Sequence, residues 1–244
     1  MLQPGLATSA RWRVRREWFE GPLADFAKTL VLDEARPVVP LAELLCGEAL
    51  DRQLLKVYGA ELMPDQQPVL VSQWMKYYAM QLIPPVMVAN LVHHVSWPLA
   101  VDQLSFALHE RGILDGVRFS GAMIDAPDSD DPFERFAPLL DNLQQVIDRL
   151  SAYGGVAAAV LWGNAGDYLE SCLRQLNPIH PVAGAVGYGL LREKTRPDGT
   201  PNPLFSAITY TKGKDGQSIR QRRSCCLSHR VEWVGRCEHC PLAR

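Results

Sequence analysis

Long uninterrupted apolar runs are absent from this sequence of 244 residues. The most apolar stretch, QLIPPVMVANLVHHVSWPLAV, is interrupted by two prolines, an asparagine and two histidines, a density that membrane spans rarely tolerate. The amino end carries no apolar stretch of signal-peptide length and soon becomes basic and aromatic. We therefore expect no integral membrane span, no export signal and a cytoplasmic location.

Several sequence signals of function are also missing. The chain has no internal repeat and no low-complexity segment, and its glycine pairs lack the strand-to-helix context of a nucleotide fingerprint. It is not basic overall, with a net charge of −2, and no recognition motif suggests a nucleic-acid partner. A hydrophobic content of 47% and a charged content of 21% are those of a globular protein. Nothing in the pattern demands an oligomer, so we expect a monomer.

Helical periodicity dominates the first two thirds of the chain. Pro84-Pro85 should break one helix from the next. Asp131 and Pro132 suit the cap and first position of the clearest helix. Helices are expected over residues 41–57 and 68–80, from Pro85 to about His94, from 132 to about 150, and within 156–176. Cys46 lies inside the first of these helices and is expected to be buried.

Strand patterns are short and come as hairpins. LSFALHERGILDGVRFSG alternates apolar and polar residues around a glycine-containing connection, and LFSAITY and QSIRQRR flank the turn signal TKGKDG. The stretch after Pro178 is rich in glycine and proline and is expected to be loop. These patterns predict an α+β fold with a helix-rich body (1–202) and a hairpin plus cysteine-rich segment (203–244).

Four of the six cysteines lie in the last twenty residues, with the spacing Cys-Cys-x10-Cys-x2-Cys. In a Cys-x2-Cys pair a tight turn brings both sulfurs to one side, which makes the pair a good chelate. Adjacent cysteines point to opposite faces of an extended chain, so they converge only if the backbone turns between them. Disulfides, a structural zinc site and an iron–sulfur cluster all remain open, although the vicinal pair departs from the usual zinc ribbon.

This tail resembles that of the FhuF-like siderophore-iron reductases, whose carboxyl-terminal signature has the same spacing. The likeness extends to RQRRSCCL before the pair, to the proline in CEHCPL and to VLWGN at 160–164. It implies that Cys225, Cys226, Cys237 and Cys240 are the ligands of a [2Fe-2S] cluster, and implies nothing for Cys46 or Cys172.

Two histidines lie within the cysteine motif, His229 and His239. Mixed histidine–cysteine ligation, as in Rieske centres, would raise the reduction potential considerably. Four cysteines already fill four ligand positions, so the alternative is that both histidines lie around the site or are exposed. His93-His94 lacks a matching carboxylate at zincin spacing and is interpreted as core or capping.

The charge is segregated toward the tail. Residues 211–244 hold eight Lys or Arg against three Asp or Glu, a local net charge of +5 in a chain of −2. Cations near an anionic cluster favour its reduced form and attract anionic partners. Arg222 and Arg223 are therefore candidate docking residues for the substrate or the electron donor. The resemblance adds Trp162 of VLWGN as a candidate docking residue, because this family segment would line the pocket near the cluster. Trp162 has a competing interpretation as a buried packing residue.

The resemblance implies a ferric siderophore reductase that reduces Fe3+ by one electron through its cluster and releases Fe2+. The substrate would be a ferric siderophore docked on the body, and the donor a ferredoxin, a flavodoxin or a flavin reductase. Two alternatives remain at this point: a zinc-stabilised binding module, and an iron–sulfur electron carrier without reductase activity.

Overall fold

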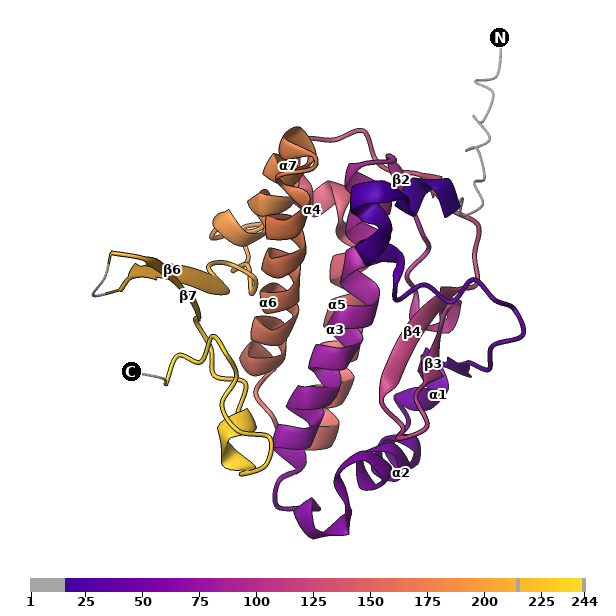
Figure 1. The fold of residues 1–244 in the computed structure, drawn as a ribbon, viewed down its shortest axis with the longest axis vertical. Coiled ribbons are helices and arrows are strands. Elements are labelled where there is room, and N and C mark those ends of the chain that lie inside the picture. The colour runs from indigo at the N-terminus through magenta and orange to yellow at the C-terminus, as the bar shows by residue number, and fades with distance from the viewer. Residues whose placement is uncertain (1–15, 214–215, 243–244) are drawn as a thin grey trace.

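A computed structural model shows a helical body with small sheets at its edges and the cysteine segment along one side (Figure 1). It describes residues 16–213 and 216–242. The α-helices are α1 (Leu41–Leu44), α2 (Gly47–Tyr58), α3 (Gln67–Leu91), α4 (Pro132–Arg135), α5 (Ala137–Gly154), α6 (Ala158–Leu176) and α7 (Pro181–Arg192). The strands are β1 (Val39–Pro40), β2 (Val95–Ser96), β3 (Leu104–Leu108), β4 (Leu114–Phe119), β5 (Ile124–Asp125), β6 (Ile208–Lys212) and β7 (Ser218–Arg222). Short 3-10 turns lie at Arg16–Phe19, Gly21–Ala27, Ala60–Leu62, Val101–Gln103 and Ser228–Arg230.

Helix α3 forms the centre of the body and packs against α5 and α6. It is buried on nearly every side, as expected of a helix that is apolar all round. The predicted break at Pro84-Pro85 is wrong, because the helix continues through both prolines. Pro85 cannot donate to the carbonyl of Gln81, and that carbonyl accepts a hydrogen bond from the Thr29 hydroxyl instead, at 2.9 Å. Among the described residues, no helix is long and apolar enough to cross a membrane.

Helices α5 and α6 are amphipathic and complete the helical layer beside α3. Asp131 caps the predicted helix as expected, since its carboxylate accepts from the Phe133 amide at 2.9 Å. That helix is interrupted at Phe136 and runs as α4 and then α5. The helix expected within 156–176 is confirmed as α6.

Two regions differ from the sequence expectation. The helix predicted over 41–57 is divided into α1 and α2, and Cys46 is the exposed residue that precedes α2, where it had been expected buried. The loop expected after Pro178 contains α7, which Pro181 begins and whose glycines permit close packing: a Cβ on Gly187 would lie 2.4 Å from Leu173.

The sheets are antiparallel and small, which confirms the predicted α+β class. Strands β1, β3 and β4 form one sheet, in the expected hairpin region, and β2 pairs with β5. Strands β6 and β7 form the second expected hairpin, on the opposite side of the body from β3 and β4 (Figure 1). Residues 214 and 215 of its predicted turn lie outside the described residues. The division at residues 202 and 203 stays a prediction.

Candidate metal centre

Strand β7 leads directly to the vicinal cysteines, where the backbone turns sharply. Leu227 adopts a left-handed conformation with φ of 66°, and its amide donates to the Cys225 sulfur at 3.3 Å. The Ser228 hydroxyl lies 3.1 Å from the Cys226 sulfur. The chain therefore bends immediately after the pair, and a backbone N–H and a hydroxyl surround the two sulfurs.

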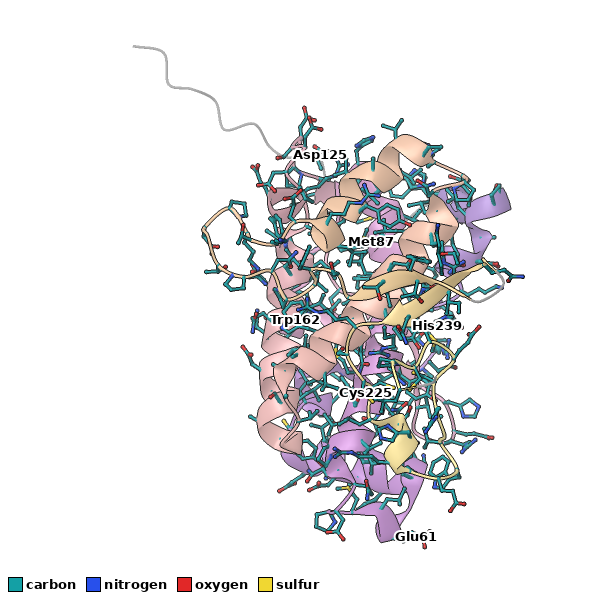
Figure 2. The ribbon with its side chains drawn as sticks, turned by 90° about the vertical axis from the view of Figure 1, so that its left-hand side faces the viewer. Glu61, Met87, Asp125, Trp162, Cys225 and His239 are labelled. Carbon is teal, nitrogen blue, oxygen red and sulfur yellow. The ribbon has the colours of Figure 1, made fainter. Side chains whose placement is uncertain are left out.

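The second cysteine pair returns alongside the first. The Cys240 amide donates to the Cys237 carbonyl at 3.2 Å, which closes the tight turn expected of Cys-x2-Cys. The Arg222 amide donates to the His239 carbonyl at 3.0 Å, so the tail lies beside the end of β7. Figure 2 shows Cys225 and His239 on the same side of the body, in this segment. The thiols of Cys226 and Cys237 are hydrogen-bonded to each other.

Helix α3 supplies polar contacts under Cys226. The Ser72 hydroxyl donates to the Cys226 carbonyl at 2.8 Å, and Asn164 of α6 donates to the Ser72 hydroxyl at 2.9 Å. One turn further along α3, the Lys76 ammonium donates to the Cys226 sulfur at 3.1 Å. Helices α3 and α6 thus hold the backbone of the cysteine segment through Ser72 and Asn164. Helix α3 also brings the Lys76 ammonium into contact with the Cys226 sulfur.

These contacts divide the protons unequally between the two thiols in contact. The hydrogen bond from Cys237 lowers the pKa of Cys226 to about 3, and Ser228 and Lys76 contribute in the same direction against the effect of burial. The same hydrogen bond raises the pKa of Cys237. The contacts with Lys76 and Ser228 therefore favour the thiolate at Cys226, and the thiolate is the form that binds metals.

Buried ion pairs attach the hairpin to α6. Arg222 is almost completely buried, and its guanidinium donates to Asn164 and, at 3.2 Å, to Asp167. Arg220 pairs with Glu170 at 2.6 Å and with Asp167 at 2.7 Å. Pairing and hydrogen bonds to both arginines offset part of the cost of removing these charges from water.

Small residues let the cysteine segment come close to α6. An ideal Cβ placed on Gly163 would lie 1.8 Å from the Ser224 hydroxyl, and one on Gly166 would lie 2.3 Å from the Ala207 side chain. Gly163 belongs to the VLWGN stretch. A glycine is required there because the residue before Cys225 occupies the space that a side chain would take.

The structure places the predicted docking residues in different environments. Arg222 and Trp162 are 2% and 3% exposed, which leaves neither a surface for a docked molecule, so their assignment as docking residues is corrected. Arg223 is exposed, and docking there stays a prediction. The Nδ1 atom of His229 lies 3.5 Å from the Cys225 sulfur. The backbone carbonyl of His239 accepts a hydrogen bond from the Arg222 amide.

Sequence reasoning missed Lys76 and Ser72, and included Asn164 only as part of the VLWGN stretch. They precede the cysteines by 61 residues or more, so no local spacing marks them. Only the packing of α3 and α6 against the tail brings Lys76 to the Cys226 sulfur, and Ser72, which Asn164 holds, to the Cys226 carbonyl.

The surroundings of the thiols suit an anionic group bound by several sulfurs. Within residues 16–213 and 216–242, no three His, Cys, Asp or Glu side chains are arranged to hold one metal ion. A two-iron cluster shares four thiolates between two metal atoms, and the Cys226–Cys237 contact shows that the two halves of the motif meet. Buried donors without a described partner lie around this segment: Gln73 Nε2, Arg222 Nε and Ser224 Oγ. Cationic and neutral donors of this kind stabilise negative charge on sulfur.

Comparison with known proteins gives matches along most of the chain. The family described as "Ferric iron reductase FhuF-like transporter" matches residues 72–218. The family described as "FhuF 2Fe-2S C-terminal domain" matches residues 222–242, which contain all four clustered cysteines. A protein of Escherichia coli (strain K12) named "Ferric siderophore reductase" is 25% identical over 227 residues, which cover 86% of this chain and 82% of that protein.

Proposed function

This chain belongs to the FhuF-like family of ferric iron reductases, and from that premise we propose that it reduces the iron of a ferric siderophore by one electron. Its carboxyl-terminal segment is a [2Fe-2S] domain, which selects the iron–sulfur cluster over the zinc alternative. The named activity of the Escherichia coli relative supports a siderophore as the iron chelate. The observation that carries the proposal is the attachment of this domain to the helical body through Ser72, Lys76 and Asn164.

The proposed cluster ligands are Cys225, Cys226, Cys237 and Cys240. When bound, a [2Fe-2S] cluster supplies one-electron transfer. The chain prepares the ligands for it: contact with Cys237 and Lys76 favours the thiolate of Cys226, and the Leu227 amide donates to the sulfur of Cys225. The positive charge of Lys76 opposes the negative charge that four thiolates bring together.

Reduction explains how the chelate would lose its iron. Siderophore oxygens hold small, highly charged Fe3+ tightly and hold Fe2+ much less well. One electron from a donor protein converts Fe3+ to Fe2+, which leaves the chelate, and protons from water occupy the freed oxygens. A ferredoxin, a flavodoxin or a flavin reductase is the proposed donor class. The cytoplasm is the proposed location, because a reducing compartment keeps the thiols available.

The test is a stoichiometric reduction without oxygen. Protein loaded with its cluster is reduced, freed of excess reductant and mixed with a ferric siderophore in the presence of a chromogenic ferrous chelator. One ferrous complex formed per oxidised cluster supports the proposal. Oxidation of the cluster with no ferrous complex, or no oxidation at all, contradicts it, and the Cys237→Ser variant gives the background rate.

A further inference from the structure

A cavity of about 670 Å³ lies between the hairpin and the helical body. Helix α6, helix α7, the segment before β6 and β6 itself form its wall, so four parts of the chain meet around it. Its volume is within the range of small-molecule sites, roughly 300–1,000 Å³. The residues of the wall used below are Glu170, Tyr188, Arg192, Phe205, Ile208 and Tyr210.

Three aromatic rings and the cation of Arg192 line this cavity, and a second arginine, Arg223, lies beside one of the rings. Tyr188, Phe205 and Tyr210 contribute rings to the wall. The guanidinium of Arg192 lies over the Tyr188 ring at 5.0 Å, and that of Arg223 lies over the Phe205 ring at 6.0 Å. Among the ion pairs of the described residues, neither arginine has a carboxylate partner.

The carboxylate of Glu170 lies in the wall but does not neutralise the positive charges of Arg192 and Arg223. Glu170 is 4% exposed, and its oxygens are bonded to Tyr210 and, at 2.6 Å, to Arg220. Arg220 also pairs with Asp167, so the carboxylates here are occupied with holding the hairpin. The cavity therefore offers a bound molecule positive charge and flat aromatic faces.

Only one strand separates the cavity from the cysteine segment. Ile208 lines the cavity and pairs with Arg222 across the hairpin. On its other edge, the Arg222 amide donates to the carbonyl of His239, the neighbour of Cys240. Two strand spacings of about 5 Å each place the cavity wall about 10 Å from the backbone beside Cys240. Figure 2 shows His239 next to the hairpin.

We propose that this cavity is the binding site of the ferric chelate, and that it selects chelates with net negative charge and flat, conjugated oxygen-donor groups. This rests on the proposed function. Arg192 and Arg223 pair with the anionic donor oxygens, and the rings of Tyr188 and Phe205 stack on the donor planes. The hairpin then forms the partition between the chelate and the thiols.

The test measures binding without electron transfer. Gallium(III) replaces Fe3+ and is not reduced, so its anionic tris-complex with 2,3-dihydroxybenzoate probes the cavity alone. The complex is titrated calorimetrically into cluster-loaded protein, wild type and the variants Arg192→Gln and Tyr188→Ala. Each variant is expected to bind roughly tenfold more weakly, because Arg192→Gln loses one charge-assisted contact and Tyr188→Ala loses one stacking ring. The control is Arg52→Gln on α2, an exposed arginine far from the hairpin, whose Kd should not change.

Different failures separate the two proposals. No binding by the wild type, or an unchanged Kd in both cavity variants that retain the cluster absorption, overturns the assignment of the cavity. Equal affinity for the neutral gallium(III) tris-complex of acetohydroxamate overturns the charge selection. Weakened binding in both cavity variants supports the binding site. If the wild type then fails to reduce the corresponding ferric complex, the binding site is retained and the reductase function is contradicted.

Discussion

The ammonium of Lys76 lies 3.1 Å from the sulfur of Cys226, although 150 residues separate them in the chain. A cluster with four thiolate ligands is anionic and gains a further negative charge on reduction, so we expect this cation to favour the reduced state of the proposed cluster. This contact joins the part of the chain that matches the FhuF-like reductase family to the part that matches the 2Fe-2S domain family.

Lys76→Met should lower the midpoint potential of the cluster, because the reduced form loses a cation that contacts a proposed ligand sulfur. We expect a decrease of about 50 mV, close to the 59 mV that corresponds to tenfold for one electron. The measurement is a redox titration followed by electron paramagnetic resonance. Lys76→Arg should restore most of the potential, and Lys28→Met, at an exposed site, should not change it. Equal potentials in wild type and Lys76→Met would show that Lys76 has no such effect.

Gly163→Ala should reduce the amount of cluster bound, since the added methyl group occupies the position of the Ser224 hydroxyl. The measurement is iron per chain together with visible absorption. Gly47→Ala is the matched control, because its Cβ meets no atom closer than 3.9 Å. Adding Ser224→Gly to Gly163→Ala should recover much of the iron, and a failure to recover would point to a cause other than this collision.

Arg222→Gln should destabilise the fold, because Asp167 and Asn164 lose the partner buried between them. We expect the free energy of unfolding to fall by about 3 kcal/mol, as for other broken buried pairs. Arg223→Gln changes the adjacent, exposed arginine and should cost less than about 1 kcal/mol. Urea unfolding of the two variants under the same conditions measures both, and similar losses would contradict the structural role of Arg222.

Cys237→Ser should abolish cluster binding, whereas Cys46→Ser should leave it intact. Cys237 contacts Cys226 within the motif, and Cys46 is an exposed thiol bonded to the Ala42 carbonyl in another part of the molecule. Iron content and the absorption of the reduced and oxidised proteins measure the outcome. Equal loss in both variants would contradict the ligand assignment.

Local sequence patterns predicted those features that depend on neighbouring residues. Three features depend only on residues close together in the sequence: the spacing of the cysteines, the cap at Asp131 and the hairpin before Cys225. Each was predicted, and each has its counterpart in the fold. Hydrophobic periodicity located α5 and α6 for the same reason.

Features that depend on distant partners could not be predicted. Pro84 and Pro85 break an isolated helix, but α3 has Thr29 to satisfy a released carbonyl and a core on every side. The tail basic cluster suggested docking at Arg222, yet the acceptors on α6 bury this arginine. No motif in the sequence around Lys76 indicates a role, because its contact with Cys226 forms only when the tail folds onto α3.

The contact between Ser72 and Cys226, 154 residues apart, also sets an order of events during biosynthesis. The ribosome completes α3 and α6 before it makes the vicinal cysteines, so the surface that receives them can form while the thiols are still untranslated. Iron insertion therefore follows the translation of α3 and α6, which precede all four proposed ligands in the chain. A nascent chain halted before Cys225 would lack all four proposed ligands and stay colourless.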